Sequence, residues 1–205
     1  MQRGHFIVVD GGDGAGKDTL IERLGKYFPD AIYIRDPGGT EIGTHVRELL
    51  QYKENLAKRA ELFLFLASRN QLVEEKIRPA LDAGKLVISN RFDLSTVAYQ
   101  IYGRERVELL EMVKTMSEFA RADVVPDLYI LLDIPPEVGI PRSRHRGEVP
   151  TRFEKEALAF HKRVRAGYLK HIGEYPKSVI IDATQSEDMV EKEALVAIQK
   201  IESNA

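Results

Sequence analysis

The sequence predicts an α/β fold in which a five-stranded parallel sheet is flanked by helices. Five short apolar runs are nearly continuous rather than alternating, as in strands that are covered on both faces. Longer segments with a helical period separate these runs, and this alternation favours parallel strands. In chain order the predicted strands are His5–Asp10, Ala31–Ile34, Leu86–Ser89, Leu128–Asp133 and Ser178–Asp182.

The segments between the strands are predicted to be helical from the spacing of their side chains. In the segment 57–81, the residues Leu62, Phe65, Leu66 and Arg69 fall at positions i, i+3, i+4 and i+7. Residues at these spacings share one face of a helix. The C-terminal segment, from position 190 onward, has roughly the same spacing and is also predicted to be a helix.

Composition limits the class of protein. The 205 residues fit one domain, 1–205, and 30 basic against 32 acidic residues argue against a surface that coats nucleic acid. The absence of cysteine excludes disulfides, thiolate metal sites and cysteine nucleophiles. No apolar run is long enough to span a bilayer and the N-terminus lacks a secretory pattern, so we expect a cytoplasmic protein without a membrane partner. Gln51–Asn55 and Pro135–Arg152 are expected to be the most mobile stretches.

A glycine-rich loop follows the first predicted strand and precedes a helical pattern. Gly11, four further residues and then Gly16-Lys17 form the frame of a Walker A phosphate loop. Glycines let the backbone N–H groups approach a triphosphate, and the lysine supplies positive charge to it. The alternative is a glycine-rich turn with an incidental lysine, which the flanking strand and helix disfavour. The predicted ATP-binding residues here are Gly11, Asp13, Gly14, Ala15, Gly16, Lys17, Asp18 and Thr19.

Asp18 departs from this motif, which normally has a serine or threonine after the lysine to bind Mg²⁺. A carboxylate next to phosphates is repelled unless a cation lies between them. We therefore hypothesise that Asp18 is a direct or water-mediated Mg²⁺ ligand, while Thr19 bonds the α-phosphate. The alternative is an aspartate at the helix start that faces away from the site.

Motifs elsewhere favour a kinase over a switch or a motor. The chain has no Asn-Lys-x-Asp guanine-binding motif, and the fourth run ends at Asp133 without the paired acidic residues of many ATP-driven motors. An acceptor kinase explains a surplus of arginines. These are Arg35, Arg47, Arg69, Arg91, Arg142, Arg144, Arg146 and Arg152.

Some of these arginines stand where a ligand would be bound. Arg35 and Arg91 each follow a strand, at the sheet edge where α/β proteins bind ligands. Phe65 and Arg69 share a helix face and could together stack on a base and donate to its exocyclic oxygen. The alternatives are an ordinary core position for Phe65 and a solvated surface charge for each arginine taken alone.

Several motifs in this order resemble the thymidylate kinase family over essentially the whole chain. They are Arg35-Asp36-Pro37-Gly38-Gly39-Thr40, Phe65-Leu66-Ala67-Ser68-Arg69, Asn90–Gln100, Leu132-Asp133, the arginine-rich Arg142–Arg152 and Asp182-Ala183-Thr184-Gln185. The resemblance implies a three-layer P-loop kinase fold with an arginine-rich lid at about 141–153. It also implies transfer of a phosphoryl group from ATP to dTMP with Mg²⁺, for dTTP synthesis, by a homodimer. The alternatives are a kinase of the same fold for another deoxynucleotide or a deoxynucleoside, and a catalytically weakened nucleotide-binding regulator.

The resemblance further implies roles for individual residues. Asp13 would accept a hydrogen bond from the 3′-hydroxyl of the acceptor sugar, and Tyr99 would lie under C2′. Phe65 would stack on thymine and Arg69 would donate to its O4. The residues assigned to dTMP are Asp13, Arg35, Pro37, Phe65, Arg69, Arg91, Ser95, Thr96, Tyr99 and Gln100, with Arg47 nearby. Those assigned to adenine are Ala183, Thr184 and Gln185.

Two departures from the family pattern bear on catalysis. Relatives carry a catalytic arginine either in the phosphate loop or in the lid, and the loop position here is Gly14. The lid arginines Arg142 and Arg146 therefore join Lys17 and Arg91 as expected catalytic residues. Asn90 stands where relatives have aspartate and Asp18 where they have threonine, so we expect Asp18 to replace the missing charge near the metal.

Overall fold

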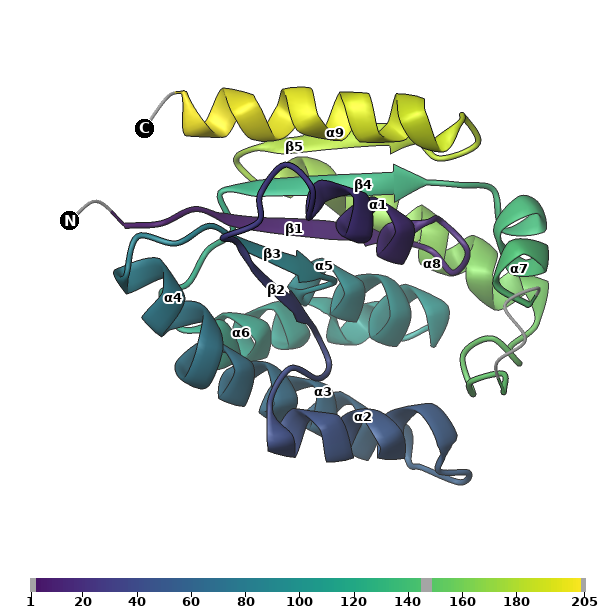
Figure 1. Ribbon diagram of the computed structural model, residues 1–205. Coiled ribbons are helices and arrows are strands. Elements are labelled where there is room, and N and C mark those ends of the chain that lie inside the picture. Colours follow the sequence, from purple (N-terminus) through teal and green to yellow (C-terminus); the bar gives the residue numbers. More distant parts are fainter. Residues whose placement is uncertain (1–2, 145–148, 204–205) are drawn as a thin grey trace.

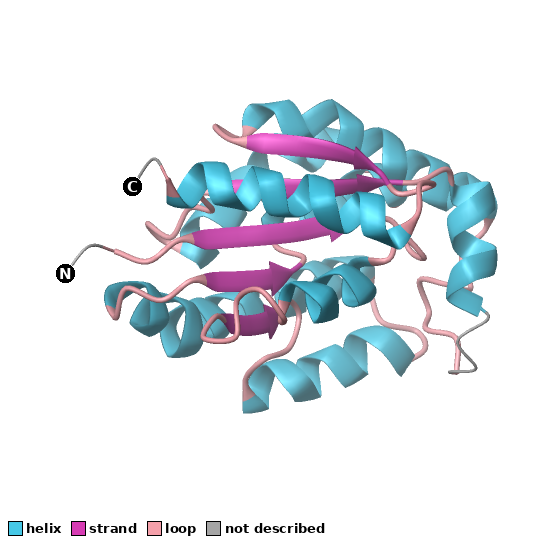
Figure 2. Cartoon of the chain, turned by 45° about the horizontal axis from the view of Figure 1, so that its top comes forward, coloured by secondary structure: helices cyan, strands magenta, loops and turns pink. Residues whose placement is uncertain are grey.

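A computed structural model describes residues 3–144 and 149–203, and it has three layers, with helices on both faces of a central sheet (Figures 1 and 2). The sheet has five strands in the order β2-β3-β1-β4-β5, and all adjacent pairs are parallel. The strands are β1 Phe6–Gly11, β2 Ile32–Arg35, β3 Val87–Asn90, β4 Leu128–Asp133 and β5 Ser178–Asp182. The predicted fold class is confirmed, with strand ends displaced by at most a residue.

Helices fill the connections between the strands. The α-helices are α1 Lys17–Leu24, α2 Glu41–Tyr52, α3 Lys58–Leu72, α4 Arg78–Asp82, α5 Asp93–Thr96, α6 Leu110–Arg121, α7 Pro136–Arg144, α8 Leu158–His171 and α9 Glu187–Glu202. Two π-helical turns, η1 Val73–Ile77 and η2 Val97–Gly103, continue α3 and α5, and the short 3-10 turns are η3 Val107–Leu109 and η4 Ile172–Glu174. The helix predicted in the segment 57–81 is confirmed, although η1 interrupts it.

Two apolar cores lie on opposite faces of the sheet. Phe6 and Val8 of β1 pack with residues of α4, η2 and α8, whereas Ile7 and Val9 pack with residues of α1 and α9. Successive strand residues point to opposite faces, so a strand covered on both sides must be apolar at every position. This is the physical reason for the continuous apolar runs in the sequence.

The parallel sheet brings the carboxyl ends of its strands to one edge. Gly11 of β1, Arg35 of β2, Asn90 of β3 and Asp133 of β4 all end their strands there. Ligands of open α/β sheets bind at this edge. The phosphate loop, residues 11–19, and the segments after β2 and β3 therefore meet at one place.

The Pro- and Arg-rich stretch begins with regular structure rather than a loop. Residues 136–144 form α7 despite Pro141 inside the helix, and Gln51 belongs to α2. Within the described residues, no helix combines the length and the apolar character that a bilayer crossing requires.

Candidate active site

Glycines shape the phosphate loop. Gly11, Gly14 and Gly16 have φ values of 147°, 72° and 85°, in the region that favours glycine. A Cβ at Gly14 would lie 1.9 Å from the carbonyl oxygen of Gly139 in α7, and a Cβ at Gly139 would lie 2.4 Å from Asp13 O. The loop and α7 thus pack backbone against backbone, which explains why the position after Asp13 has no side chain.

Lys17 is buried and folded back onto the loop. Its Nζ donates hydrogen bonds to the carbonyl oxygens of Gly11 at 3.1 Å and Gly12 at 2.7 Å. Burial and the neighbouring Arg91 guanidinium lower the pKa of Lys17 to about 7, against the opposing effect of nearby carboxylates. A phosphate group beside this amine would favour its charged form.

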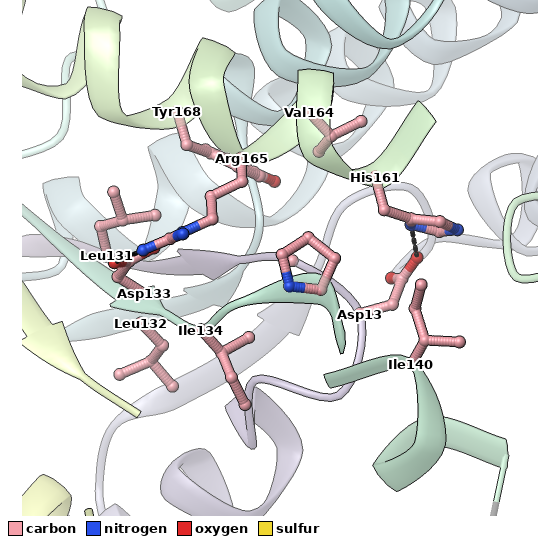
Figure 3. Close-up of a pocket in the computed structure, with 12 residues that line it drawn as sticks. Asp13, Leu131, Leu132, Asp133, Ile134, Ile140, His161, Val164, Arg165 and Tyr168 are labelled. Carbon is pink, nitrogen blue, oxygen red and sulfur yellow. Dashed lines mark hydrogen bonds and ion pairs between the residues drawn. The ribbon is translucent and has the colours of Figure 1, made fainter. Parts of the chain in front are cut away.

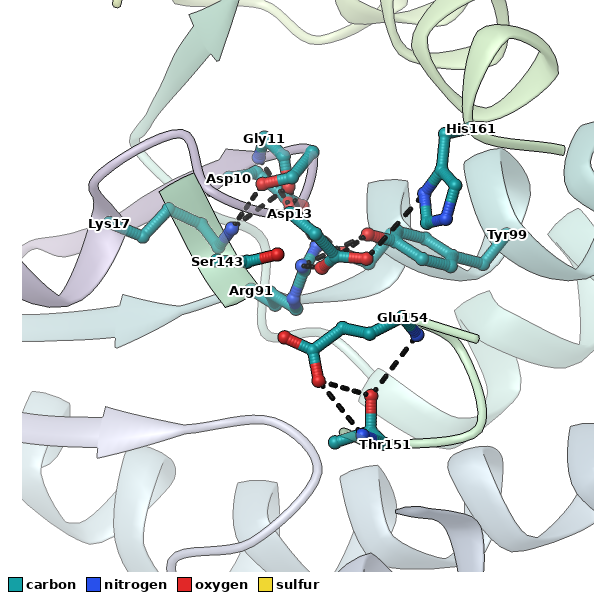
Figure 4. A network of polar contacts seen from close by, with 12 residues as sticks. Asp10, Gly11, Asp13, Lys17, Arg91, Tyr99, Ser143, Thr151, Glu154 and His161 are labelled. Atoms are coloured by element: carbon teal, nitrogen blue, oxygen red, sulfur yellow. Dashed lines mark hydrogen bonds and ion pairs between the residues drawn. The ribbon is translucent and has the colours of Figure 1, made fainter. Parts of the chain in front are cut away.

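Arg91 is the hub of the polar network that Figure 4 shows. It lies between β3 and α5 with a φ of 70°, an uncommon conformation for a residue with a side chain. Its Nη1 donates to Gly11 O at 2.8 Å and to the Tyr168 hydroxyl at 2.7 Å, and its Nη2 donates to Asp13 Oδ1 at 3.0 Å. The guanidinium is thereby fixed beside the phosphate loop.

Asp13 receives hydrogen bonds through one carboxylate oxygen. Its Oδ1 accepts from Arg91 and, at 3.0 Å, from the Tyr99 hydroxyl. Burial favours the neutral acid, but Arg91, Lys17 and His161 outweigh burial and lower the pKa of Asp13 below its ordinary value. Asp13 is therefore ionised at neutral pH, as an acceptor for a sugar hydroxyl requires.

A cleft of about 620 Å³ opens between the phosphate loop, α2, α3, η2 and the segment 149–157. Pockets for small ligands have about this size. The predicted site residues that line it are Asp13, Gly14, Lys17, Asp18, Thr19, Arg35, Pro37, Phe65, Arg69, Arg91, Ser95, Thr96, Tyr99 and Gln100. Residues predicted from separate motifs are thus brought together around one space.

The cleft wall includes an aromatic ring and a buried guanidinium from α3. Arg69 is buried, with Nε bonded to Asp36 Oδ2 at 2.6 Å and Nη2 bonded to Thr96 Oγ1 at 2.9 Å. Its Nη1 has no hydrogen-bond partner among the described residues, although it is buried. Burial works against the charged form, but Asp36 and other acidic neighbours raise the pKa of Arg69. The half-buried Phe65 lies one turn earlier on α3 and also lines the cleft.

The cleft also concentrates positive charge. Arg35, Arg47 and Arg91 all line it, and Arg47 Nη1 donates to Pro37 O at 3.2 Å. Burial together with Arg35 and Arg91 lowers the pKa of Arg47 to about 10. Guanidinium groups that repel one another in this way are stabilised by a bound anion, so these arginines suit a phosphate.

Asp18 lines the cleft and contacts Asn90 and Arg35. Its Oδ1 accepts a hydrogen bond of 2.6 Å from Asn90 Nδ2 and is ion-paired with Arg35. The alternative that Asp18 faces away from the site is therefore wrong.

Two residues predicted to bind dTMP line the cleft but form hydrogen bonds with other side chains of the protein. Ser95 Oγ donates to Asp10 Oδ1 at 2.7 Å, and Gln100 Nε2 donates to Glu61 Oε1 at 2.7 Å. Both residues line the cleft, but their strongest partners lie in the protein. Their assignment to the acceptor stays a prediction.

A second, much smaller cavity lies behind the phosphate loop (Figure 3). It has a volume of about 20 Å³, room for one water molecule. The buried His161 and Asp13 face one another at its wall, with Nδ1 and Oδ2 3.7 Å apart. Arg165 holds Asp133 at the opposite side through hydrogen bonds of 2.7 and 2.8 Å.

The residues assigned to adenine lie outside the cleft, in the turn between β5 and α9. Arg142 Nη1 donates to Ala183 O at 2.9 Å, Thr184 Oγ1 donates to Asp182 at 2.7 Å, and Gln185 Nε2 donates to Glu193 at 3.0 Å. The guanidinium of Arg142 is thus bonded to the turn in which the residues assigned to adenine lie. Arg146 and part of the expected lid lie outside the described residues, so their catalytic role stays a prediction.

Several residues of the site were not found from the sequence. Asp10, Glu61, Phe153, His161 and Tyr168 each contact a predicted site residue or line the cleft. The sequence carries a signal only next to Phe153, because the neighbouring Arg152 belongs to the predicted arginine surplus. The others follow apolar or helical patterns that give no indication of a polar role.

Comparisons with known proteins agree with this geometry. The family model described as thymidylate kinase matches residues 9–194. A thymidylate kinase of Oenococcus oeni is 41% identical over 98% of this chain and 97% of its own, and one of Protochlamydia amoebophila is 37% identical over 97% and 93%. A crystal structure of thymidylate kinase from Ehrlichia chaffeensis superimposes with a TM-score of 0.74 at 26% identity, covering 96% of this chain and 99% of that one. The chain belongs to the thymidylate kinase family.

Proposed function

We infer that this chain transfers the γ-phosphoryl group of ATP to dTMP, giving ADP and dTDP. The observation that carries this inference is the cleft itself. Phe65 and Arg69 line it together with the guanidinium groups of Arg35, Arg47 and Arg91, and the phosphate loop borders it. A nucleoside monophosphate carries a base and a phosphate, which an aromatic ring and a group of arginines around one space can bind.

Two residues on one face of α3 are suited to thymine. Phe65 offers a ring for stacking, and the guanidinium of Arg69, which lines the same cleft, would donate to O4. Tyr99 is bonded to Asp13 through its hydroxyl and lines the cleft, where it would contact the sugar. A large ring at this place leaves no room for a 2′-hydroxyl, so it favours a deoxynucleotide.

The chemistry needs charge neutralisation more than proton transfer. The second pKa of a phosphate monoester is about 6, so the attacking oxygen is already an anion near neutrality and needs no general base. The obstacle is the repulsion between two polyanions. Lys17, Arg35 and Arg91 would offset it and hold the two phosphates in line.

The residues present fit a Mg²⁺ ion that is shared with the nucleotide. The described residues contain no group of three or more His, Cys, Asp or Glu side chains that could hold a metal alone. Mg²⁺ in kinases is held by one or two carboxylates together with waters and phosphates, and Asp18 offers one carboxylate at the cleft. When bound, Mg²⁺ supplies positive charge to the phosphates. Asp18 remains our proposed ligand.

The donor side completes the proposal. Backbone N–H groups of the phosphate loop would cradle the triphosphate of ATP, and Ala183, Thr184 and Gln185 would line the adenine. Arg142, which already bonds the backbone at Ala183, and Arg146 would supply charge to the donor phosphates from the lid at about 141–153.

A homodimer and a cytoplasmic location belong to the same proposal. Exposed apolar side chains occur on three helices that are neighbours in space: α2 contacts α3, and α3 contacts α6. They are Ile42, Leu49, Phe63, Met112 and Phe119, of which Phe119 is 87% exposed. An apolar surface of this kind is typical of a protein interface. The cysteine-free composition fits a reducing compartment.

The test is release of ADP by the purified protein with ATP, Mg²⁺ and a panel of acceptors. We expect dTMP to give the highest kcat/KM, followed by dUMP, with little turnover of UMP or thymidine. Preference for thymidine would favour a deoxynucleoside kinase instead. Absence of ADP release with every acceptor, by protein that binds nucleotides, would favour the regulator.

A further inference from the structure

A buried carboxylate outside the phosphate loop joins three parts of the cleft wall. Glu61 lies in the first turn of α3 and its side chain is 1% exposed. Its Oε1 accepts from Gln100 Nε2 at 2.7 Å and from Arg104 Nε at 3.2 Å. Its Oε2 accepts from Arg104 Nη2 at 3.2 Å and from Arg152 Nη2 at 2.6 Å. One carboxylate thus connects α3, η2 and the segment 149–157.

Arg152 ties this segment to the end of α2. Its side chain donates to Leu50 O through Nε at 3.1 Å and Nη2 at 3.0 Å, and its backbone N–H donates to Gln51 O at 2.9 Å. Basic side chains commonly bond the last carbonyls of a helix in this way. The segment is further ordered by Glu154, which accepts from Thr151 Oγ1 at 3.0 Å (Figure 4).

The two arginines held by Glu61 also flank the ring of Phe153. The guanidinium carbons of Arg104 and Arg152 lie 5.5 and 5.6 Å from the ring centroid. On its other sides the ring meets Tyr99 edge-on at 5.7 Å between centroids and Phe65 at 6.2 Å. Phe153 lines the cleft together with both of these aromatic residues.

Stability alone does not explain a charged group in this place. Removing a carboxylate from water costs several kcal/mol, and apolar packing of similar volume often stabilises a protein as well or better. What a fully bonded carboxylate provides is a defined geometry for its partners. Here those partners are the two guanidinium groups that contact Phe153.

We propose that Glu61 is a positioning residue of the acceptor site: by holding Arg104 and Arg152, it fixes the Phe153 ring as the wall of the cleft beside Phe65. The inference rests on the proposed function, because the wall completes the space assigned to the base and sugar of dTMP. Glu61 acts through Phe153 and does not touch the nucleotide. The ring of Phe153 limits the size of the acceptor that fits beside Phe65.

The test is a double-mutant cycle with Glu61→Gln and Phe153→Ala, measured as KM for dTMP, KM for ATP and kcat. Each single variant is expected to raise KM for dTMP by about threefold to tenfold, the range of one aromatic contact, with KM for ATP unchanged. The double variant is expected to resemble Phe153→Ala alone, because Glu61 then has no ring to position. Glu74→Gln, an exposed glutamate further along the same helical segment, is the matched control and should change neither constant.

If the Glu61→Gln variant does not fold, Arg152→Met is used in its place, since Arg152 is the more exposed partner in the same ion pair. Additive effects of the two substitutions, or an unchanged KM for dTMP in Phe153→Ala, would overturn the inference. Failure of the wild-type chain itself to turn over dTMP would instead contradict the proposed function. The two failures are therefore distinguishable in one set of assays.

Discussion

Asn90 Nδ2 donates a 2.6 Å hydrogen bond to Asp18 Oδ1, and so joins the two positions at which this chain departs from the pattern of its family. The resemblance to the family implies aspartate at the first position and threonine at the second. On that comparison, the contact keeps one carboxylate and one neutral partner, with the carboxylate on Asp18. We propose that the two departures are a single exchange.

Asn90→Asp alone should lower turnover. It would place two carboxylates at hydrogen-bond distance, and their repulsion is worth about 1–4 kcal/mol at 4 Å outside the deep interior. We expect kcat with dTMP to fall by about fivefold or more. Steady-state rates at saturating Mg²⁺ provide the measurement, and a faster enzyme would refute the exchange.

Asp18→Thr combined with Asn90→Asp should restore the activity that each single substitution removes. The pair then has the family's residues, with one carboxylate and one neutral partner again. The Mg²⁺ concentration for half-maximal rate should rise in Asp18→Thr and return toward normal in the double variant. An unaltered Mg²⁺ dependence in Asp18→Thr would show that Asp18 is not a metal ligand.

Binding of ATP should take up a proton at Lys17. The pKa of this amine is about 7 in the ligand-free protein, and phosphates beside it would raise that value. Between pH 7 and the higher pKa of the complex, the complex holds more protons than the free protein, so affinity falls as pH rises. Calorimetry in buffers of different ionisation enthalpy measures this uptake, which Lys17→Met should abolish. Equal heats in all buffers at pH 8 would contradict it.

Gly14→Ala should destabilise the protein, whereas Gly12→Ala should not. A Cβ at Gly14 would meet Gly139 O at 1.9 Å, while a Cβ at Gly12 would have no heavy atom within 4 Å. The loop must move away from α7 in the first variant, at a cost of about 1–3 kcal/mol. Thermal unfolding of the two variants is the comparison, and equal melting temperatures would be inconsistent with this packing.

Arg69→Lys should weaken dTMP binding more than it weakens folding. Lysine keeps the charge beside Asp36 but loses the planar fork that reaches Thr96 and the base together. KM for dTMP should rise by about tenfold, with KM for ATP unchanged. Arg69→Met should unfold more readily, because a buried charge left without its partner costs about 3–5 kcal/mol. The same KM for dTMP in Arg69→Lys and wild type would argue against a contact with the base.

Local pattern was enough to predict the sheet and the phosphate loop. The strands are covered on both faces, so their apolar runs mark them to within a residue, and Gly11, Gly16 and Lys17 lie in a loop whose backbone geometry depends on those residue types. The extent of helix α7 was not predicted: the stretch was expected to be mobile, with only Arg142 and Arg146 placed on a helix face, because Pro141 and the arginines around it are typical of a loop. The two π-helical turns also have no signature in the spacing of apolar residues.

Contacts between distant residues account for most of what the sequence did not reveal. Glu61 meets Arg152 across 91 residues, and His161 meets Asp13 from the far side of the phosphate loop. Glu61 and His161 occupy positions where helical period predicts an ordinary helix residue. Their roles arise only when folding brings separate elements to one edge of the sheet.

A crystal structure of the protein with dTMP and a non-hydrolysable ATP analogue tests the central claim most directly. We predict thymine stacked on the Phe65 ring with O4 bonded to Arg69, and the acceptor phosphate between Arg35 and Arg91. The γ-phosphate should lie beside Lys17, in line with that phosphate. Thymine bound anywhere other than against Phe65 would contradict this account of the cleft.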